Sequence, residues 1–284
     1  LEPFNQIQIT TEGVTRLKLD FRDSGWPFKP IRPRLTIDGQ KLTLDDWEEA
    51  PGIQCEFVLG ERWSVVEEVD RRLRKKPGLQ GPIDDAFCSR FVFVVPSRPA
   101  VHGVVQRWVD RELEYAVDRW TRLMRGNVRD VQDTAVTADQ IERSHLICFG
   151  DFTSNQYLRA VSMQLPIKWT REQLQVGSRQ FDPSTHAAAF CFPNPRNPDR
   201  YLVVNSGITF REFSNVSNSR QIAMLPDWVV MDVSDERDGG TGIFPGQIAA
   251  EGFFDEQWTL QPERQGVRSQ IGDLGNTGIP QTAN

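Results

Sequence analysis

The sequence predicts an α/β protein in which a mixed, mostly parallel three-layer sheet follows a small antiparallel β unit. The first 70 residues hold short β-prone runs separated by turn residues. An apolar run at 91–95 precedes an amphipathic helical pattern, and this alternation of strand and helix then repeats. The later strands 187–192 and 201–204 are joined by a loop too short for a crossover helix, so one antiparallel pair is also expected.

Residues 1–75 are predicted to form the antiparallel β unit. Its clearest signal is the pair Asp38-Gly39 between two alternating runs, because these residues tolerate the positive φ angles of a type I′ hairpin turn. A second hairpin is expected around Gly60-Glu61. The predicted strands are 7–10, 14–19, 35–37, 41–44, 55–59 and 63–66.

Residues 76–235 are predicted to form the mixed α/β domain. Apolar residues recur at three- and four-residue steps from Val105 to Leu123, which is typical of a helix with one buried face, and Gly126 follows as a stop signal. The other predicted elements are strands 91–95, 146–149, 187–192, 201–204 and 228–233, a hairpin over 174–181, and helices over 154–164 and 208–213. Residues 236–284 are expected to be an extended or partly disordered tail that can pack through Phe253 and Trp258.

Composition narrows the possible partners. Lys and Arg number 33 against 39 Asp and Glu, so the formal net charge is −6. This acidic balance disfavours a nucleic-acid binder, which needs a basic face. No apolar run reaches the length of about 18 residues that a membrane span requires. The basic run at 71–76 is typical of a solvated face, although it can also dock an acidic partner domain.

The sequence predicts neither a cofactor nor a metal site. It has no GxGxxG or GxxxxGK[ST] motif, and its four cysteines form no CxxC pair. Cys148 and Cys191 lie inside apolar strands and are expected to be core thiols. A disulfide is possible in an exported protein, but the spacing of Cys55, Cys88 and the other two nominates no pair.

Candidate ligand-binding residues gather where predicted strands end. In an open α/β sheet, ligands bind beyond the carboxyl ends of the parallel strands. Asp151 and Asn155 follow strand 146–149, and Asn205 follows strand 201–204. These three polar side chains can bind a small polar ligand. The alternative is that Asp151 satisfies N–H groups of its own turn while Thr153 or Ser154 caps the next helix.

The catalytic candidates are Asp151, His186 and Ser206. Ser206 lies between a strand and a predicted helix, but a nucleophile elbow needs small residues where this chain has Val204 and Ile208. His186 is the histidine best placed to face a cleft, although a hydrogen-bonded loop residue is the simpler interpretation. We therefore expect no hydrolytic triad. A serine or cysteine bonded to an imidazole, beside two backbone amides aimed at one empty spot, would contradict this expectation.

Several strings are more specific than generic propensity requires. They are TIDG at 36–39, RKKPGLQGPIDDAF at 74–87, GDFTSN at 150–155, LPIKW at 165–169, FPNP at 192–195, RYLVVNSG at 200–207 and LPDW at 225–228. In this order they resemble the carboxy-terminal region of large prolyl-oligopeptidase-like α/β-hydrolase proteins of planctomycete-type bacteria, over roughly residues 5–235. The resemblance implies a serine-hydrolase domain upstream of Leu1 and a periplasmic or extracellular location. The nucleophile elbow of that domain is absent from this chain.

Three functions follow as hypotheses. The first is a non-catalytic accessory or interaction domain of a larger exported serine-hydrolase-like protein, which docks its own upstream hydrolase domain or another protein through the loops 81–87 and 194–200. The second is a stand-alone hydrolase-type enzyme with a polar site at the carboxyl edge of the sheet. The third is a glycan-binding module that uses exposed Trp26, Trp63 or Trp169, because aromatic faces suit sugar rings.

Overall fold

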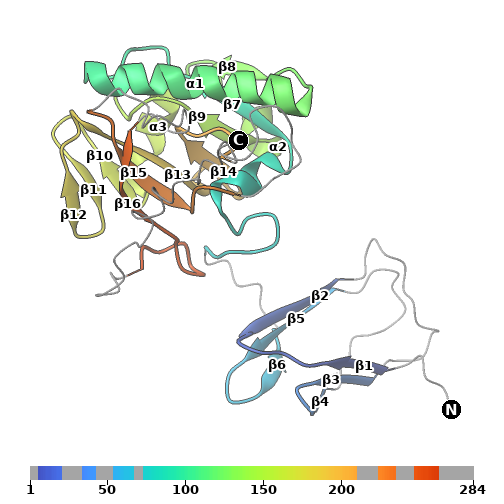
Figure 1. The fold of residues 1–284 in the computed structure, drawn as a ribbon. Coiled ribbons are helices and arrows are strands. Elements are labelled where there is room, and N and C mark those ends of the chain that lie inside the picture. Colours follow the sequence, from blue (N-terminus) through green and yellow to red (C-terminus); the bar gives the residue numbers. More distant parts are fainter. Residues whose placement is uncertain are drawn as a thin grey trace, which may run out of the picture. The chain divides into compact units, whose positions relative to one another are not determined.

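The computed structural model describes residues 6–20, 34–42, 54–66, 73–209, 223–234 and 246–261. The chain divides into two compact units, Leu1–Arg71 and Arg72–Asn284 (Figure 1). Each unit has its own hydrophobic core. Strands make up 38% of the described residues and helices 21%, so the protein has much more strand than the predicted class implies.

The first unit consists of two three-stranded sheets. One contains β1 (Gln6–Ile9), β3 (Arg34–Ile37) and β4 (Gln40–Leu42), and the other contains β2 (Arg16–Asp20), β5 (Gln54–Leu59) and β6 (Trp63–Val65). The predicted Asp38-Gly39 turn between β3 and β4 is confirmed, with φ angles of 47° and 80°. The unit is not wholly antiparallel, because β1 pairs in parallel with β3 across a connection long enough for a crossover.

A seven-stranded sheet with the order β16-β15-β13-β14-β9-β7-β8 forms the centre of the second unit. Its strands are β7 (Phe91–Val95), β8 (Asp130–Gln132), β9 (His145–Cys148), β13 (His186–Asn194), β14 (Asn197–Val204), β15 (Trp228–Asp232) and β16 (Gln247–Gly252). The four strands from β14 to β8 pair in parallel. The other three of the six pairings are antiparallel.

Helices cover only part of this sheet. They are α1 (Gly103–Met124), α2 (Ala138–Arg143), α3 (Gln156–Val161) and the 3₁₀ turns η1 (Ile83–Phe87) and η2 (Ser162–Gln164). A separate small sheet contains β10 (Ile167–Trp169), β11 (Leu174–Val176) and β12 (Arg179–Phe181). The long helix α1 crosses one face of the large sheet (Figure 1), and its Val105, Val109 and Ala116 are buried there, as the periodicity predicted. Within the described ranges no helix is long and apolar enough to cross a membrane.

The predicted mostly parallel three-layer α/β class is therefore wrong. A parallel pair needs a crossover between its strands, and α1 and α2 supply such crossovers only from β7 to β8 and from β8 to β9. After β9 the chain passes through the short helix α3 and the small sheet β10–β12, and a tight turn then joins β13 to β14, so β14 pairs in parallel with β9 but antiparallel with β13. The edge strand β16 lies in the segment predicted as a tail. The predicted helix 208–213 is not formed at Ile208 or Thr209, and its other residues lie outside the described part of the chain.

A buried ion pair joins three separate segments of the second unit. Asp227 precedes β15, its side chain is fully buried, and its Oδ2 lies 2.5 Å from Lys75 Nζ. The same oxygen accepts a hydrogen bond of 2.9 Å from the backbone N–H of Phe254, while Lys75 Nζ lies 5.1 Å from the ring centroid of Trp258. Burial raises the pKa of Asp227, and the Lys75 ammonium opposes this rise. The basic run at 71–76 is thus not wholly a solvated face, because Lys75 pairs with a buried carboxylate.

Gly81 allows the loop after Lys75 to approach this ion pair. Its φ is +75°, and a Cβ at this position would lie 1.9 Å from Asp227 Oδ1. The N–H of Gly81 donates to the Tyr201 hydroxyl at 2.7 Å, and that hydroxyl donates to Asp85 Oδ2 at 2.6 Å. Loop 73–81, the start of β15 and the segment after β16 therefore meet at one buried polar cluster.

The glycines at 81 and 78 offer a matched test of this close approach. Their φ angles are +75° and +76°, but nothing lies within 4 Å of a Cβ built on Gly78. Gly78→Ala is expected to lower the free energy of unfolding by about 1 kcal/mol through backbone strain alone. Gly81→Ala should cost at least about 2 kcal/mol more, because the methyl group must displace the buried carboxylate. Urea unfolding of the two variants measures this difference, and equal losses would contradict the packing described for Gly81.

Candidate functional site

The carboxyl edge of β9 and β14 is closed by the side chain of Asn205. This residue follows β14 with a φ of 52° and is 1% exposed. Its Oδ1 accepts from the N–H of Gly150 at 2.8 Å, and its Nδ2 donates to the carbonyls of Gly150 at 2.9 Å and Ala188 at 3.2 Å. The amide thus connects the ends of β9 and β14 with β13, and all these contacts are to backbone.

Asp151 and Asn155 also bond to the backbone around them. Asp151 Oδ1 accepts from the N–H groups of Thr153 at 2.8 Å and Ser154 at 2.7 Å. Asn155 caps α3, because its Oδ1 accepts from the N–H of Leu158 at 3.1 Å. These contacts match the alternative prediction, in which the polar residues complete a turn and cap a helix. The capping residue is Asn155, however, and not Thr153 or Ser154.

The other two catalytic candidates also have local partners. Ser206 is buried, and its Oγ donates to the carbonyl of Gly207 at 2.9 Å. His186 begins β13 with its Nδ1 3.2 Å from the carbonyl oxygen of Asp182. In the described part of the chain, no hydrogen bond links Asp151, His186 and Ser206 to one another. The structure brings the candidates to one edge of the sheet but does not join them as a triad.

A serine–histidine contact does occur, between residues that the sequence did not single out. Ser89 Oγ lies 2.7 Å from His145 Nε2. His145 begins β9 and is 2% exposed, whereas Ser89 is exposed in the loop before β7. No local pattern signals this pair, because 56 residues separate its members and only the parallel pairing of β7 with β9 brings them together.

The second nitrogen of the ring decides what this pair can do. The backbone N–H of Tyr201 donates to His145 Nδ1 at 2.8 Å, so Nδ1 carries no proton. In a neutral imidazole the proton must then lie on Nε2, which donates it to Ser89 Oγ. A general base would instead need a free lone pair on Nε2 to accept the serine proton. His145 therefore positions Ser89 but does not activate it.

The electrostatic surroundings keep His145 neutral. Its pKa is lowered from 6.5 to about 4, mainly by burial and also by the nearby Arg200 guanidinium, while Asp85 opposes both effects. The doubly protonated ring is thus disfavoured near neutral pH. The Tyr201 hydroxyl beside it also stays protonated, because burial and the hydrogen bond to Asp85 raise its pKa.

The cysteines offer no activated thiolate in the interior. All four are free, with Cys148 and Cys191 buried in β9 and β13 as predicted for core thiols. Burial raises the pKa of both well above the ordinary value, so these thiols remain neutral. Cys55 is half-buried and Cys88 is exposed. Among the residues described, no group of three or more His, Cys, Asp and Glu side chains could hold a metal ion.

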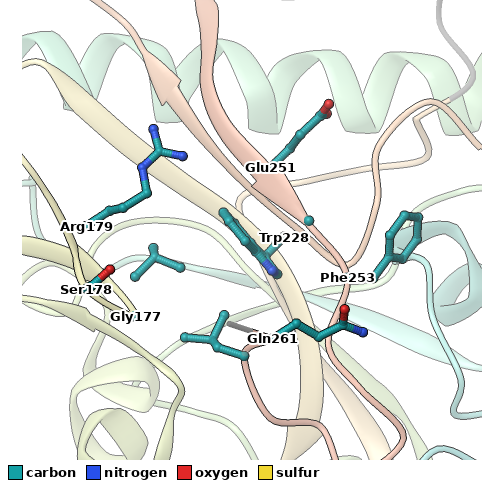
Figure 2. Close-up of a pocket in the computed structure, with 10 residues that line it drawn as sticks. Gly177, Ser178, Arg179, Trp228, Glu251, Phe253 and Gln261 are labelled. Carbon is teal, nitrogen blue, oxygen red and sulfur yellow. The ribbon is translucent and has the colours of Figure 1, made fainter. Parts of the chain in front are cut away.

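A pocket of about 510 Å³ lies elsewhere, between the β11–β12 hairpin and the strands β15 and β16. Figure 2 shows Trp228 at its centre, with Arg179 on one side and Phe253 on the other. Ser178, Glu251 and Gln261 complete the labelled polar lining. The sequence did not mark these residues as a site, since they come from three separate segments.

The tryptophans proposed from the sequence for glycan binding are not exposed where the structure describes them. Trp63 and Trp169 are each 4% exposed, and Trp26 lies outside the described residues. Trp63 is part of the core of the first unit and donates from Nε1 to Asp38 at 2.9 Å. Trp169 packs near Phe152 in the second unit.

None of the protein-family models, curated proteins or solved structures compared with this chain matches it.

The protonation state of His145 predicts a specific pH dependence of stability. Its folded pKa of about 4 lies below the unfolded value of 6.5, so protonation favours the unfolded chain and stability falls as the pH drops through this window. His145→Asn retains an acceptor for the Tyr201 N–H but does not titrate. Between pH 7.5 and 5, wild-type protein is expected to lose about 2 kcal/mol more unfolding free energy than the variant. Urea unfolding at the two pH values measures this difference. Equal losses of unfolding free energy in the two proteins would contradict the neutral state of His145.

Proposed function

We propose that this chain is a non-catalytic interaction domain. The observation that supports this most directly is the N–H of Tyr201 on His145 Nδ1, because it leaves Nε2 as a donor toward Ser89. A serine that receives a hydrogen bond from the imidazole lacks the general base that a hydrolase nucleophile needs. The backbone contacts of Asp151, Asn155 and Asn205 also support a structural role for the carboxyl edge.

The proposed docking surface consists of the loops 81–87 and 194–200 predicted from the sequence, together with the adjacent residues 76–80. Lys76 forms an ion pair with Asp199, and the Tyr201 hydroxyl accepts from the Gly81 N–H. Arg200 Nε donates to the carbonyl of Glu142 at the end of α2, at 3.2 Å. Contacts of this kind hold two chain segments together before a partner arrives, and such preorganisation lowers the entropy cost of docking.

The proposed partner is an upstream serine-hydrolase domain of the same protein. This part of the proposal comes from the resemblance to the carboxy-terminal region of prolyl-oligopeptidase-like proteins, which also implies export to the periplasm or the exterior. Lys76 is paired with Asp199, so the exposed side chain of Arg196 supplies positive charge at the turn between β13 and β14 in an acidic chain. An acidic patch on the partner would complement this charge and speed the encounter.

A direct test of catalysis uses the isolated chain with ester and peptide substrates and with a fluorophosphonate that labels activated serines. We expect neither turnover nor labelling, because no imidazole lone pair faces the Ser89 hydroxyl. Ser89→Ala and His186→Ala serve as matched variants. Turnover or labelling that either variant abolishes would overturn the proposal and favour the stand-alone enzyme.

A test of docking begins with the coding sequence upstream of Leu1, where we expect a domain with a GxSxG motif. That domain, expressed separately, should bind this chain. Arg196→Glu should weaken binding about tenfold, whereas Arg122→Glu on the exposed face of α1 should leave it unchanged, because only the former changes the charge of the docking surface. Isothermal titration calorimetry measures both affinities. Failure of the upstream domain to bind, or equal effects of the two variants, would contradict the docking surface.

A further inference from the structure

The pocket beside β16 is built around an aromatic side chain. Trp228 begins β15 and lies opposite Gly252 in the antiparallel pair of β15 with β16. A Cβ on Gly252 would lie 2.7 Å from Trp228 Cζ2 and 3.2 Å from its Nε1. The glycine therefore allows the indole to lie against the backbone of β16, and any larger residue would push the ring away.

A second aromatic side chain lies at the rim of the same pocket. Phe253 is 57% exposed, which is unusual for a phenylalanine that follows a strand of the central sheet. Its neighbour Phe254 is held by the bond of its N–H to the buried carboxylate of Asp227. Phe253 is thus presented to solvent by a fixed backbone.

The polar lining of the pocket has balanced charge. Arg179 supplies one positive charge and Glu251 one negative charge, while Ser178 and Gln261 are neutral. Arg179 is held in place by a hydrogen bond of 3.0 Å from its Nη2 to the carbonyl of Ala249. A lining of this composition offers both donors and acceptors and favours a neutral ligand over an anion or a cation.

Size and chemistry together define a class of ligand. The volume of about 510 Å³ lies within the range typical of small-molecule sites. Sugar rings combine an apolar C–H face, which packs on aromatic side chains, with hydroxyl groups that both donate and accept hydrogen bonds. We propose that this pocket binds a neutral oligosaccharide, with sugar rings against Trp228 and Phe253 and hydroxyl groups on Arg179 and Gln261.

The test titrates the full chain with cellohexaose, xylohexaose, maltohexaose and chitohexaose while calorimetry and tryptophan fluorescence are recorded. At least one of these neutral probes is expected to bind and to change the fluorescence. Phe253→Ala should weaken binding about fivefold, the effect of losing about 1 kcal/mol of aromatic contact. Trp228→Ala should weaken binding further. If Trp228→Ala fails to fold, Phe253→Ala alone still tests the proposal.

Ile248→Ala is the matched control, because Ile248 is 46% exposed on β16 but does not line the pocket. It should bind as the wild-type chain does. The proposal is wrong if none of the four probes binds at about 10 mM, or if tetragalacturonate or an aromatic peptide binds more tightly than all of them. It is also wrong if Phe253→Ala has no more effect than the control. These residues are separate from the docking surface, so Arg196→Glu should leave oligosaccharide binding intact and either proposal can fail alone.

Discussion

The buried ion pair of Asp227 with Lys75 is the interaction on which the second unit most depends. A fully buried carboxylate is costly unless it is paired and hydrogen-bonded, and here both the ammonium and the N–H of Phe254 meet it. Because these groups come from three distant segments, satisfying one charge also positions the loop after Lys75 and the segment after β16. The aromatic rim of the pocket and the docking surface both adjoin this cluster.

The pair of Ser89 with His145 shows how little a short distance alone says about catalysis. The two side chains meet at the length of a normal hydrogen bond, and the ring is buried. The direction of the bond is set by the backbone N–H of Tyr201, which occupies the other nitrogen. The buried polar groups at the carboxyl edge likewise have structural partners, because each of them completes the hydrogen bonding of a strand end or a turn.

Local signals predicted many of the individual elements, because each depends on residues close together in the chain, but they did not predict α2, β8 or β10. The Asp38-Gly39 turn, the strand over 91–95 and the long amphipathic helix are present as expected. Pairing was harder to predict. The edge strand β16 has a mixed pattern, so only its contact with β15 identifies it. The sequence placed the candidate polar residues at one edge of the sheet, but their partners are backbone groups that carry no side-chain signal.

By itself the sequence determined where the chain turns, which stretches are apolar enough to be buried, and that Cys148 and Cys191 belong to the core. Tertiary structure alone decided the mixture of parallel and antiparallel pairs, the partial burial of Lys75 and the proton on His145 Nε2. The physical reason is the range of the interactions. Turn and helix preferences act over a few residues, whereas the desolvation of a charge or the tautomer of a ring depends on neighbours brought from far along the chain.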